Sequence, residues 1–177
     1  MTDQILQPIT HEDFFAYVES HPDTRFDFID GELVEVSPKP LHGYLQARLT
    51  ILLGKWLEGN PIGIIHTEVL HVLGGDKFMP DISINQEKAY DHAYFDTPPL
   101  LAVEIRSDTQ SRAAQRRKAL RYIAQQTPAV LLILPGEGIE LFTQETGETP
   151  QVFKGDQLVK DIPGLDGLQI KVSELFA

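Results

Sequence analysis

Apolar residues recur at helical spacing in two long stretches of the chain. In residues 41–57, LHGYLQARLTILLGKWL, leucines and a tryptophan fall three or four positions apart, which predicts a long helix with one buried stripe. Residues 109–126, TQSRAAQRRKALRYIAQQ, predict a second helix, which Ser107 or Asp108 can cap. A shorter helix is expected near the N-terminus because TxxD, from Thr10 to Asp13, resembles a capping box and is followed by FFAYV. The packing stripe expected on the second helix comprises Ala113, Ala119, Leu120 and Ile123.

Other stretches alternate between apolar and polar residues or are apolar throughout, as strands are. RFDFI and ELVEV flank Asp30-Gly31, which predicts a hairpin, because a type I′ turn needs positive φ at both central positions. Residues 63–73 and 78–85 predict two strands joined by a glycine turn. Further strands are expected at residues 100–106 and 129–134, with edge strands or a small β extension at residues 139–144, 151–155 and 168–172.

The order of these elements predicts an α/β fold. A mixed central sheet is expected to be flanked by helices, with an N-terminal β-hairpin and a small C-terminal β extension. The helix at residues 109–126 would cross over between two strands of that sheet. No repeat or linker divides the 177 residues, so a single domain is expected to span residues 1–177.

Composition excludes several kinds of site. The chain has no cysteine, which rules out disulfides, thiolate nucleophiles and cysteine-ligated zinc. No apolar run is long enough to span a membrane, and MTDQILQPIT does not resemble a signal peptide, so we expect a cytoplasmic protein without a membrane partner. The formal net charge of −11 weighs against general affinity for nucleic acid.

Basic residues are nevertheless gathered in one segment. Only Asp108 opposes them between Arg106 and Arg121. This cluster can receive a phosphate chain, although a solvated helix face explains it equally simply. Its members are Arg106, Arg112, Arg116, Arg117, Lys118 and Arg121.

Two carboxylates interrupt otherwise apolar strands. Alternation places Glu104 on one face of residues 100–106 and Asp81 on one face of residues 78–85. If these strands pair in a suitable register, Asp81 and Glu104 stand close together and repel unless a proton or a hard cation such as Mg²⁺ lies between them. Structural alternatives remain open, because Asp81 can cap a turn after Pro80 and Glu104 can pair with Arg106 or a helix arginine.

The following helix carries a cation that can reach these acids. Lys118 and Tyr122 are one helical turn apart and are expected near the edge of the packing stripe. A lysine there can pack its stem while its ammonium reaches a cleft, or it can simply extend into solvent.

Together these segments resemble the Uma2 family of restriction-endonuclease-like proteins, within the PD-(D/E)xK nuclease superfamily. Pro80-Asp81 followed by Val103-Glu104-Ile105 carries the superfamily likeness. RFDFIDGELVEVSP, LLAVEIRSDTQS and IPGLDGLQIKVSELF extend the resemblance to the family over nearly the whole chain.

The resemblance implies a restriction-endonuclease-like core that uses Mg²⁺ or Mn²⁺. Asp81, Glu104 and the backbone carbonyl of Ile105 would be the metal ligands. Arg106 occupies the position of the usual superfamily lysine, and Lys118 from the next helix would replace that lysine. Four further residues match family positions or adjoin the site. These auxiliary candidates are Glu32, Glu68, Arg106 and Tyr122.

The function expected from these residues is metal-dependent hydrolysis of phosphodiester bonds, in DNA rather than RNA. Lys118 would orient the attacking water or stabilise charge on the phosphate, and Arg112, Arg116 and Arg117 would contact flanking phosphates. A homodimer is expected, since nucleases of this kind that cut both strands often use two active sites. The alternatives are an inactive nuclease-fold module that binds nucleic acid or a protein, and another enzyme with paired acids, such as a glycosidase.

Overall fold

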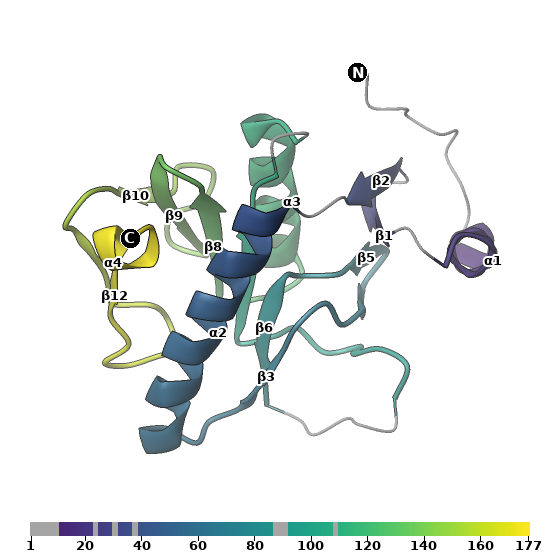
Figure 1. Ribbon diagram of the computed structural model, residues 1–177. Helices are drawn as coiled ribbons and strands as arrows, with labels where there is room; N and C mark the ends of the chain where they lie inside the picture. The colour runs from purple at the N-terminus through teal and green to yellow at the C-terminus, as the bar shows by residue number, and fades with distance from the viewer. Residues whose placement is uncertain (1–10, 23–24, 30–31, 37–38, 87–91, 108–109) are drawn as a thin grey trace.

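The computed structural model describes residues 11–22, 25–29, 32–36, 39–86, 92–107 and 110–177. Figure 1 shows these residues arranged around a central sheet. The helices are α1 (His11–Ser20), α2 (Pro40–Gly59), α3 (Arg112–Ala124) and α4 (Val172–Leu175). The strands are β1 (Arg25–Ile29), β2 (Glu32–Val36), β3 (Ile64–His66), β4 (His71–Leu73), β5 (Asp76–Phe78), β6 (Ile82–Asn85), β7 (Leu101–Ile105), β8 (Ala129–Leu134), β9 (Gly138–Thr143), β10 (Gln151–Phe153), β11 (Leu158–Val159) and β12 (Ile170–Lys171).

The central sheet is mixed, as predicted. Its six strands lie in the order β10-β9-β8-β7-β6-β3. β7 and β8 are parallel and are joined through α3, whereas the other neighbouring pairs are antiparallel. This confirms the α/β architecture and the crossover. In the described part of the chain, no helix is both long and apolar enough to cross a lipid bilayer.

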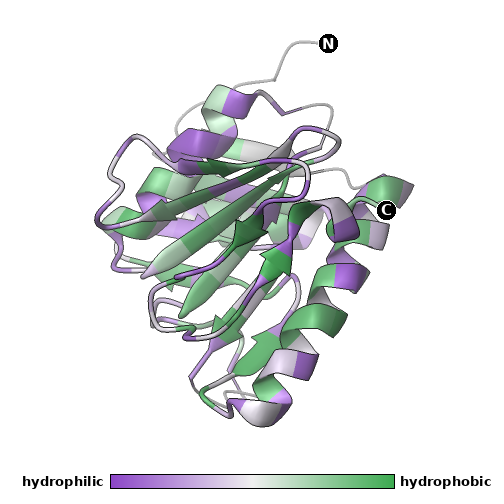
Figure 2. Ribbon diagram, turned by 90° about the vertical axis from the view of Figure 1, so that its left-hand side faces the viewer, coloured by the Kyte–Doolittle hydropathy of each residue, from purple (hydrophilic) through white to green (hydrophobic). Residues whose placement is uncertain are grey.

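Alternation along β7 sends its side chains into two different apolar clusters. Leu101, Val103 and Ile105 pack in the cluster that contains the buried leucines of α2. Ala102 packs in the cluster that contains the buried face of α3. Glu104 follows the alternation of Ala102 and therefore faces α3. The two helices thus cover opposite faces of a sheet whose strands are largely hydrophobic (Figure 2).

The predicted N-terminal hairpin is confirmed but is part of a larger sheet. β1 and β2 pair antiparallel, with Ile29 opposite Glu32. β5 pairs with β1 and β4 with β5, so four strands lie in the order β2-β1-β5-β4. The turn at Asp30-Gly31 and the capping position Thr10 lie outside the described residues.

Two of the predicted strands are divided in the structure. Residues 63–73 form β3 and β4, which belong to different sheets, and Glu68 between them has a φ of 57°. Residues 78–85 are broken at Pro80, which has no N–H to donate to a ladder. The prediction of two continuous strands was therefore wrong, and Asp81 lies in the link directly before β6.

The C-terminal strands partly match their prediction. β10 lies at an edge of the central sheet, and β11 pairs with β12 as a small separate extension. β9, however, lies between β8 and β10 and is buried along its whole length. Its interior position follows from pairing with the fully buried β8, which residue periodicity alone does not reveal.

The helix after β7 differs from expectation in its start and in its buried face. Ser111 caps α3, because its hydroxyl accepts a hydrogen bond from the amide of Ala114 at 3.1 Å; Ser107 does not cap it, and Asp108 lies outside the described residues. Ala113 is exposed rather than part of the packing stripe. The residues of α3 that are buried are Gln115, Lys118, Ala119, Tyr122 and Ile123. The polar members Lys118 and Tyr122 therefore lie within the packed face, not at its edge.

A buried histidine between the two sheets makes stability depend on pH. His71 Nε2 lies 2.9 Å from Asn85 Oδ1, and its ring stacks on Phe95. Burial lowers the pKa of His71 below its usual 6.5. Because the unfolded chain then binds a proton more readily than the folded chain, the contribution of His71 is complete above pH 6.5 and is lost as the pH falls through 6.5 toward the lowered folded value.

We therefore expect an NMR titration of the His71 ring in the folded protein to have its midpoint below 6.5. Urea unfolding of the parent protein is expected to show a loss of stability in that acidic range, and the loss should be smaller in His71→Gln. A ring that titrates at or above the ordinary value would contradict this account.

Candidate active site

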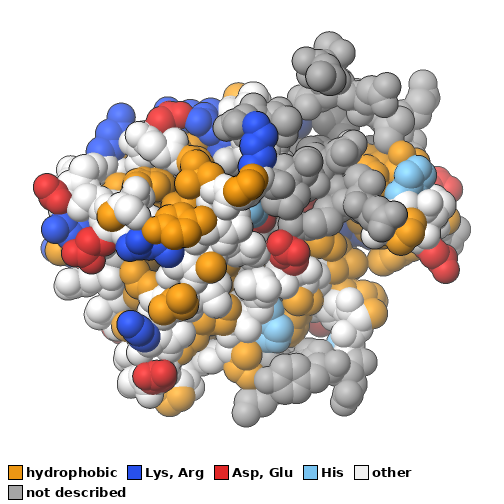
Figure 3. All heavy atoms as spheres, viewed as in Figure 1, with side chains coloured by type: hydrophobic (Ala, Val, Ile, Leu, Met, Phe, Trp, Pro, Cys, Tyr) orange, Lys and Arg blue, Asp and Glu red, His pale blue; other side chains and the backbone are white. Residues whose placement is uncertain are grey.

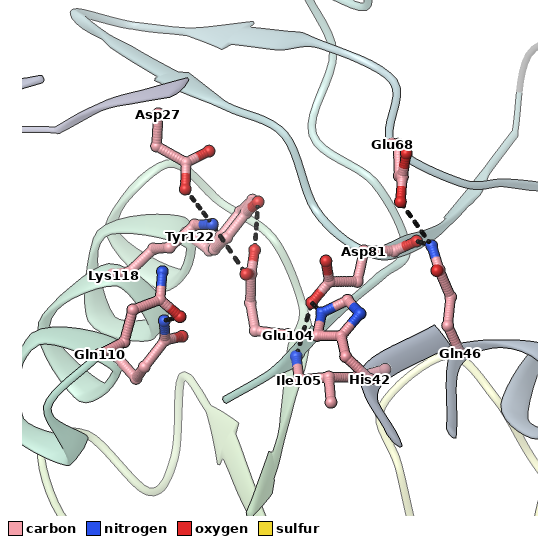
Figure 4. A network of polar contacts seen from close by, with 11 residues as sticks. Asp27, His42, Gln46, Glu68, Asp81, Glu104, Ile105, Gln110, Lys118 and Tyr122 are labelled. Carbon is pink, nitrogen blue, oxygen red and sulfur yellow. Dashed lines mark hydrogen bonds and ion pairs between the residues drawn. The ribbon is translucent and has the colours of Figure 1, made fainter. Parts of the chain in front are cut away.

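Asp81 and Glu104 lie opposite each other at one end of two paired strands. β6 and β7 pair antiparallel with Ile82 opposite Val103, so the preceding position of β6 stands opposite Glu104. Asp81 Oδ2 accepts a hydrogen bond from the amide of Ile105 at 2.7 Å. Both residues are buried, each with 3% of its surface exposed. The structure thus brings together the two acids that the sequence singled out (Figure 4).

Two side chains of α3 contact Glu104 from above the sheet. Lys118 Nζ lies 2.7 Å from Oε2, and the Tyr122 hydroxyl donates to Oε1 at 2.9 Å. The Tyr122 ring stacks on Phe78 with centroids 4.1 Å apart, which holds its hydroxyl in place. Both oxygens of the Glu104 carboxylate therefore have a hydrogen-bond donor from the crossover helix.

A third acid, Asp27, reaches the same lysine from the other sheet. Its Oδ2 lies 2.6 Å from Lys118 Nζ, and its Oδ1 accepts the amide hydrogen of Met79 at 3.0 Å. Asp27 is 1% exposed and comes from the centre of β1. Our sequence reasoning did not select it, although its position between Phe26 and Phe28 carries the signal that singled out Glu104, a carboxylate inside an apolar strand.

Two residues of α2 contact Asp81 and were also not selected from the sequence. His42 Nε2 lies 3.1 Å from Asp81 Oδ2, and Gln46 donates to the Asp81 backbone carbonyl at 2.8 Å. Gln46 also donates to Glu68 at 3.3 Å. In Figure 4 these contacts reach Asp81 from α2, while Glu104 is contacted from α3. No sequence signal indicated them, because the histidine belongs to no metal-binding motif.

The remaining auxiliary candidates are Glu68, Arg106 and Glu32. Glu68 lies in the link between β3 and β4, and its carboxylate accepts a hydrogen bond from Gln46. Arg106 follows Glu104 by two positions but forms an ion pair with Glu137. Glu32 begins β2, and its side chain lies outside the described part of the chain.

The arginines of α3 contact a second buried acid. Arg112 Nε donates to Glu140 at 2.9 Å, and Arg116 donates to both oxygens of the same carboxylate at 2.6 and 2.8 Å. Glu140 is 0% exposed, and its pKa is lowered because the bonds from Arg116 and Arg112 outweigh the opposing effect of burial. Arg117 is exposed on the outer side of the helix. Arg112 and Arg116, expected from the sequence to bind phosphate, thus also pair with a buried acid.

Negative charge exceeds positive charge around Glu104. Burial raises its pKa to about 8; Lys118 opposes this shift, while Asp81 and Asp27 add to it. Burial lowers the pKa of Lys118, but Asp27 and Glu104 more than offset this effect, so its pKa is raised and the ammonium stays charged. One lysine therefore neutralises only part of the charge of the surrounding acids.

The oxygen donors at this centre suit a hard divalent cation. Mg²⁺ prefers oxygen ligands, and the carboxylates of Asp81 and Glu104 are of this kind. Because Mg²⁺ keeps several of its waters, one or two carboxylates from the protein are enough to bind it. The raised pKa of Glu104 indicates that an additional positive charge would stabilise its ionised form. Among the described residues, no group of three or more carboxylates and imidazoles is arranged to hold a metal ion by itself. The side-chain donors at this centre are the two carboxylates, and waters would have to supply most of the other ligands of such a cation.

Comparison with known proteins places this geometry in a family. No curated protein matches the sequence. A crystal structure described as a putative nuclease belonging to DUF820, from Anabaena variabilis, is similar with a TM-score of 0.82 and 22% sequence identity, covering 96% of this chain and 98% of that chain. At this identity the likeness shows the fold, which is nuclease-like. The family model of Uma2, described as "Putative restriction endonuclease", matches residues 11–173, and the chain therefore belongs to the Uma2 family.

Proposed function

We propose that this protein is a Mg²⁺- or Mn²⁺-dependent endonuclease that hydrolyses phosphodiester bonds, in DNA rather than RNA. The observation that carries the proposal is the meeting of Asp81 and Glu104 at one end of β6 and β7, with Lys118 Nζ 2.7 Å from Glu104. Metal-assisted phosphoryl transfer needs acids that bind the cation and a positive charge near the phosphate, and two buried acids beside a lysine meet both needs. Membership of the Uma2 family, described as "Putative restriction endonuclease", supports the same activity.

In this proposal Asp81, Glu104 and the backbone carbonyl of Ile105 would hold the cation. The chemistry that such a cation would supply is a lowered pKa of a water that it binds and polarisation of a phosphoryl oxygen. Asp81 is oriented by the amide of Ile105, and Glu104 is oriented by the hydroxyl of Tyr122. These contacts restrict both carboxylates before a substrate arrives, which lowers the cost of organising the site.

Lys118 would act as a fixed positive charge rather than as a base. Its raised pKa means that it keeps its proton through the neutral range, so it cannot accept one from water. A charged ammonium beside Glu104 can instead stabilise negative charge that develops on the phosphate. This favours the second of the two roles considered for Lys118.

Recognition of the nucleic-acid backbone would involve the basic side chains near the end of β7. Arg106 lines a small pocket with Lys39, His42 and Ser107, next to Asp81. Arg112, Arg116 and Arg117 of α3 would contact flanking phosphates, and the side chains of Arg112 and Arg116 are 36% and 39% exposed beside their ion pairs with Glu140. On the face drawn in Figure 3, basic side chains are interspersed with acidic and apolar ones. We therefore expect the protein to contact only a short stretch of the nucleic-acid backbone.

A second candidate function is a catalytically inactive module that binds nucleic acid or a protein partner. The contacts of Glu104 favour this module. Lys118 and Tyr122 donate to Glu104, and Lys118 also donates to Asp27, so each of these groups has a hydrogen-bond partner without a cation.

We further propose that the chain forms one domain, because Asp27 of the four-stranded sheet bonds to α3, which covers the six-stranded sheet. A homodimer would be required to cut both strands at once.

Supercoiled plasmid DNA tests the proposed function. We expect nicking or linearisation with Mg²⁺ or Mn²⁺, none with EDTA, and weaker action on a matched RNA. Calorimetric titration with Mn²⁺ should release or absorb heat in the parent protein. Absence of both cleavage and heat from folded protein would reject the nuclease and leave the binding module.

A further inference from the structure

Asp81 is held from three directions by groups outside its own link. The amide of Ile105 donates to Oδ2 at 2.7 Å, and His42 Nε2 lies 3.1 Å from the same oxygen. Gln46 donates to the backbone carbonyl of Asp81 at 2.8 Å. The Ile105 amide and the His42 imidazole meet at one carboxylate oxygen and restrict its position, and with it the directions available to the other oxygen.

The geometry of α2 makes His42 and Gln46 act on one target. They are four residues apart, so their side chains lie one above the other on the same face of the helix. Pro40 lies in the first turn, where its fixed φ favours the start of a helix. The helix is anchored against the central sheet by the buried side chains of Leu45, Leu49 and Leu53. The donor atoms that reach Asp81 are therefore mounted on a rigid element.

The imidazole of His42 satisfies only one of its two nitrogens within the described residues. A carboxylate only accepts hydrogen bonds, so Nε2 carries the hydrogen that faces Asp81. Nδ1 is buried and has no hydrogen-bond partner among the described residues. An unsatisfied buried polar atom opposes folding, and such exceptions in a native protein need an explanation. The contact with Asp81 is the explanation that the structure offers.

We propose that His42 is a positioning residue for the candidate metal centre: its Nε2–H holds Asp81 in the orientation in which the carboxylate faces Glu104. This inference rests on the proposed function for its purpose, although the contact between His42 and Asp81 does not itself depend on a cation. Partners of this kind behind a metal ligand typically affect metal affinity about 10–100-fold. His42 acts through Asp81 and touches none of the reacting atoms.

Three substitutions separate this role from simple packing. In His42→Gln the amide nitrogen can occupy the place of Nε2 and still donate to Asp81. In His42→Asn the side chain is shorter, and its amide nitrogen falls near the place of Nδ1. This variant has a similar polarity but cannot donate to Asp81. His42→Leu removes the donor altogether. Ile51→Ala serves as a control on the exposed side of the same helix, where the native side chain is 59% exposed.

Two measurements are made on each variant after circular dichroism confirms its fold. Calorimetry gives the dissociation constant for Mn²⁺, and the amide NMR spectrum of the metal-free protein reports the Ile105 N–H that bonds to Asp81. We expect Mn²⁺ binding about 10-fold or more weaker in His42→Asn and His42→Leu, and within about 3-fold of the parent in His42→Gln and Ile51→Ala. The Ile105 amide signal should move in the first two variants and keep its position in the last two.

Equal Mn²⁺ affinity and an unmoved Ile105 signal in all four variants would overturn the proposal. If the parent binds no Mn²⁺, the proposed metal centre fails, and the Ile105 signal alone decides whether His42 positions Asp81. If His42→Leu does not fold, the comparison of His42→Gln with His42→Asn decides: a difference in favour of Gln supports the role, and identical behaviour rejects it.

Discussion

Replacing Glu104 by glutamine is expected to reduce metal-dependent DNA cleavage by about a thousandfold or more while the protein stays folded, since loss of even a single transition-state donor costs about 10²–10³ in rate. Glutamine removes the negative charge that would bind the cation and keeps the shape of the side chain. The Glu104→Gln variant should remain folded. Burial raises the pKa of Glu104 to about 8, and Asp81 and Asp27 add to this shift while Lys118 opposes it. Burial thus opposes the charged form of this side chain, and a neutral amide of the same shape does not carry that cost.

The measurement is the rate of plasmid nicking in Mg²⁺, compared with Glu145→Gln, in which the same change is made at an exposed position after β9. Thermal unfolding of each variant controls for loss of the fold. Cleavage by Glu104→Gln at more than a tenth of the parent rate would show that the activity does not use this acid. The site would then have to be sought elsewhere or the activity assigned to a contaminant.

Replacing Lys118 by methionine is expected to lower the free energy of unfolding by about 3–5 kcal/mol, the usual cost of removing one partner from a buried ion pair. Methionine fills much of the space of the lysine stem and removes only the ammonium. Asp27 and Glu104, which lie 2.6 and 2.7 Å from that ammonium, would then face each other without a cation between them. Their repulsion adds to the cost of burial.

Urea unfolding at neutral pH measures this loss, with Lys55→Met on the exposed side of α2 as the matched control. The control should change stability by no more than about 0.5 kcal/mol, as surface substitutions usually do. Adding Asp27→Asn to Lys118→Met should recover part of the stability, because it removes one of the two uncompensated carboxylates. A loss below about 1 kcal/mol in Lys118→Met would show that the acids are not dependent on this lysine.

Most elements of the fold could be predicted because their signals are local. The leucine spacing of α2, the Asp-Gly turn signal between β1 and β2, and the apolar run of β8 each specify an element within a few residues. The errors arose where long-range pairing decides. Residues 63–73 and 78–85 each read as one strand, yet each is shared between two sheets, and no periodicity within the segment shows this.

The candidate site was only partly predictable for the same reason. Asp81, Glu104 and Lys118 lie within one run of the chain, and their order carries the family signal. Asp27 lies 91 positions before Lys118, and His42 comes from a helix whose histidine matches no motif. Their roles follow from contacts that exist only once the two sheets and α2 have packed together.

By itself the sequence determined the helices, most strands, the mixed sheet and the two acids inside apolar strands, because alternation and helical spacing are properties of neighbouring residues. Only the tertiary structure decided that Asp27 and Glu104 share one lysine, that Lys118 is buried in the packed face of α3, and that Arg112 and Arg116 meet Glu140. Those outcomes depend on which surfaces meet and in which register, and the free energy of burying a charge is set by its partners, which local sequence does not specify.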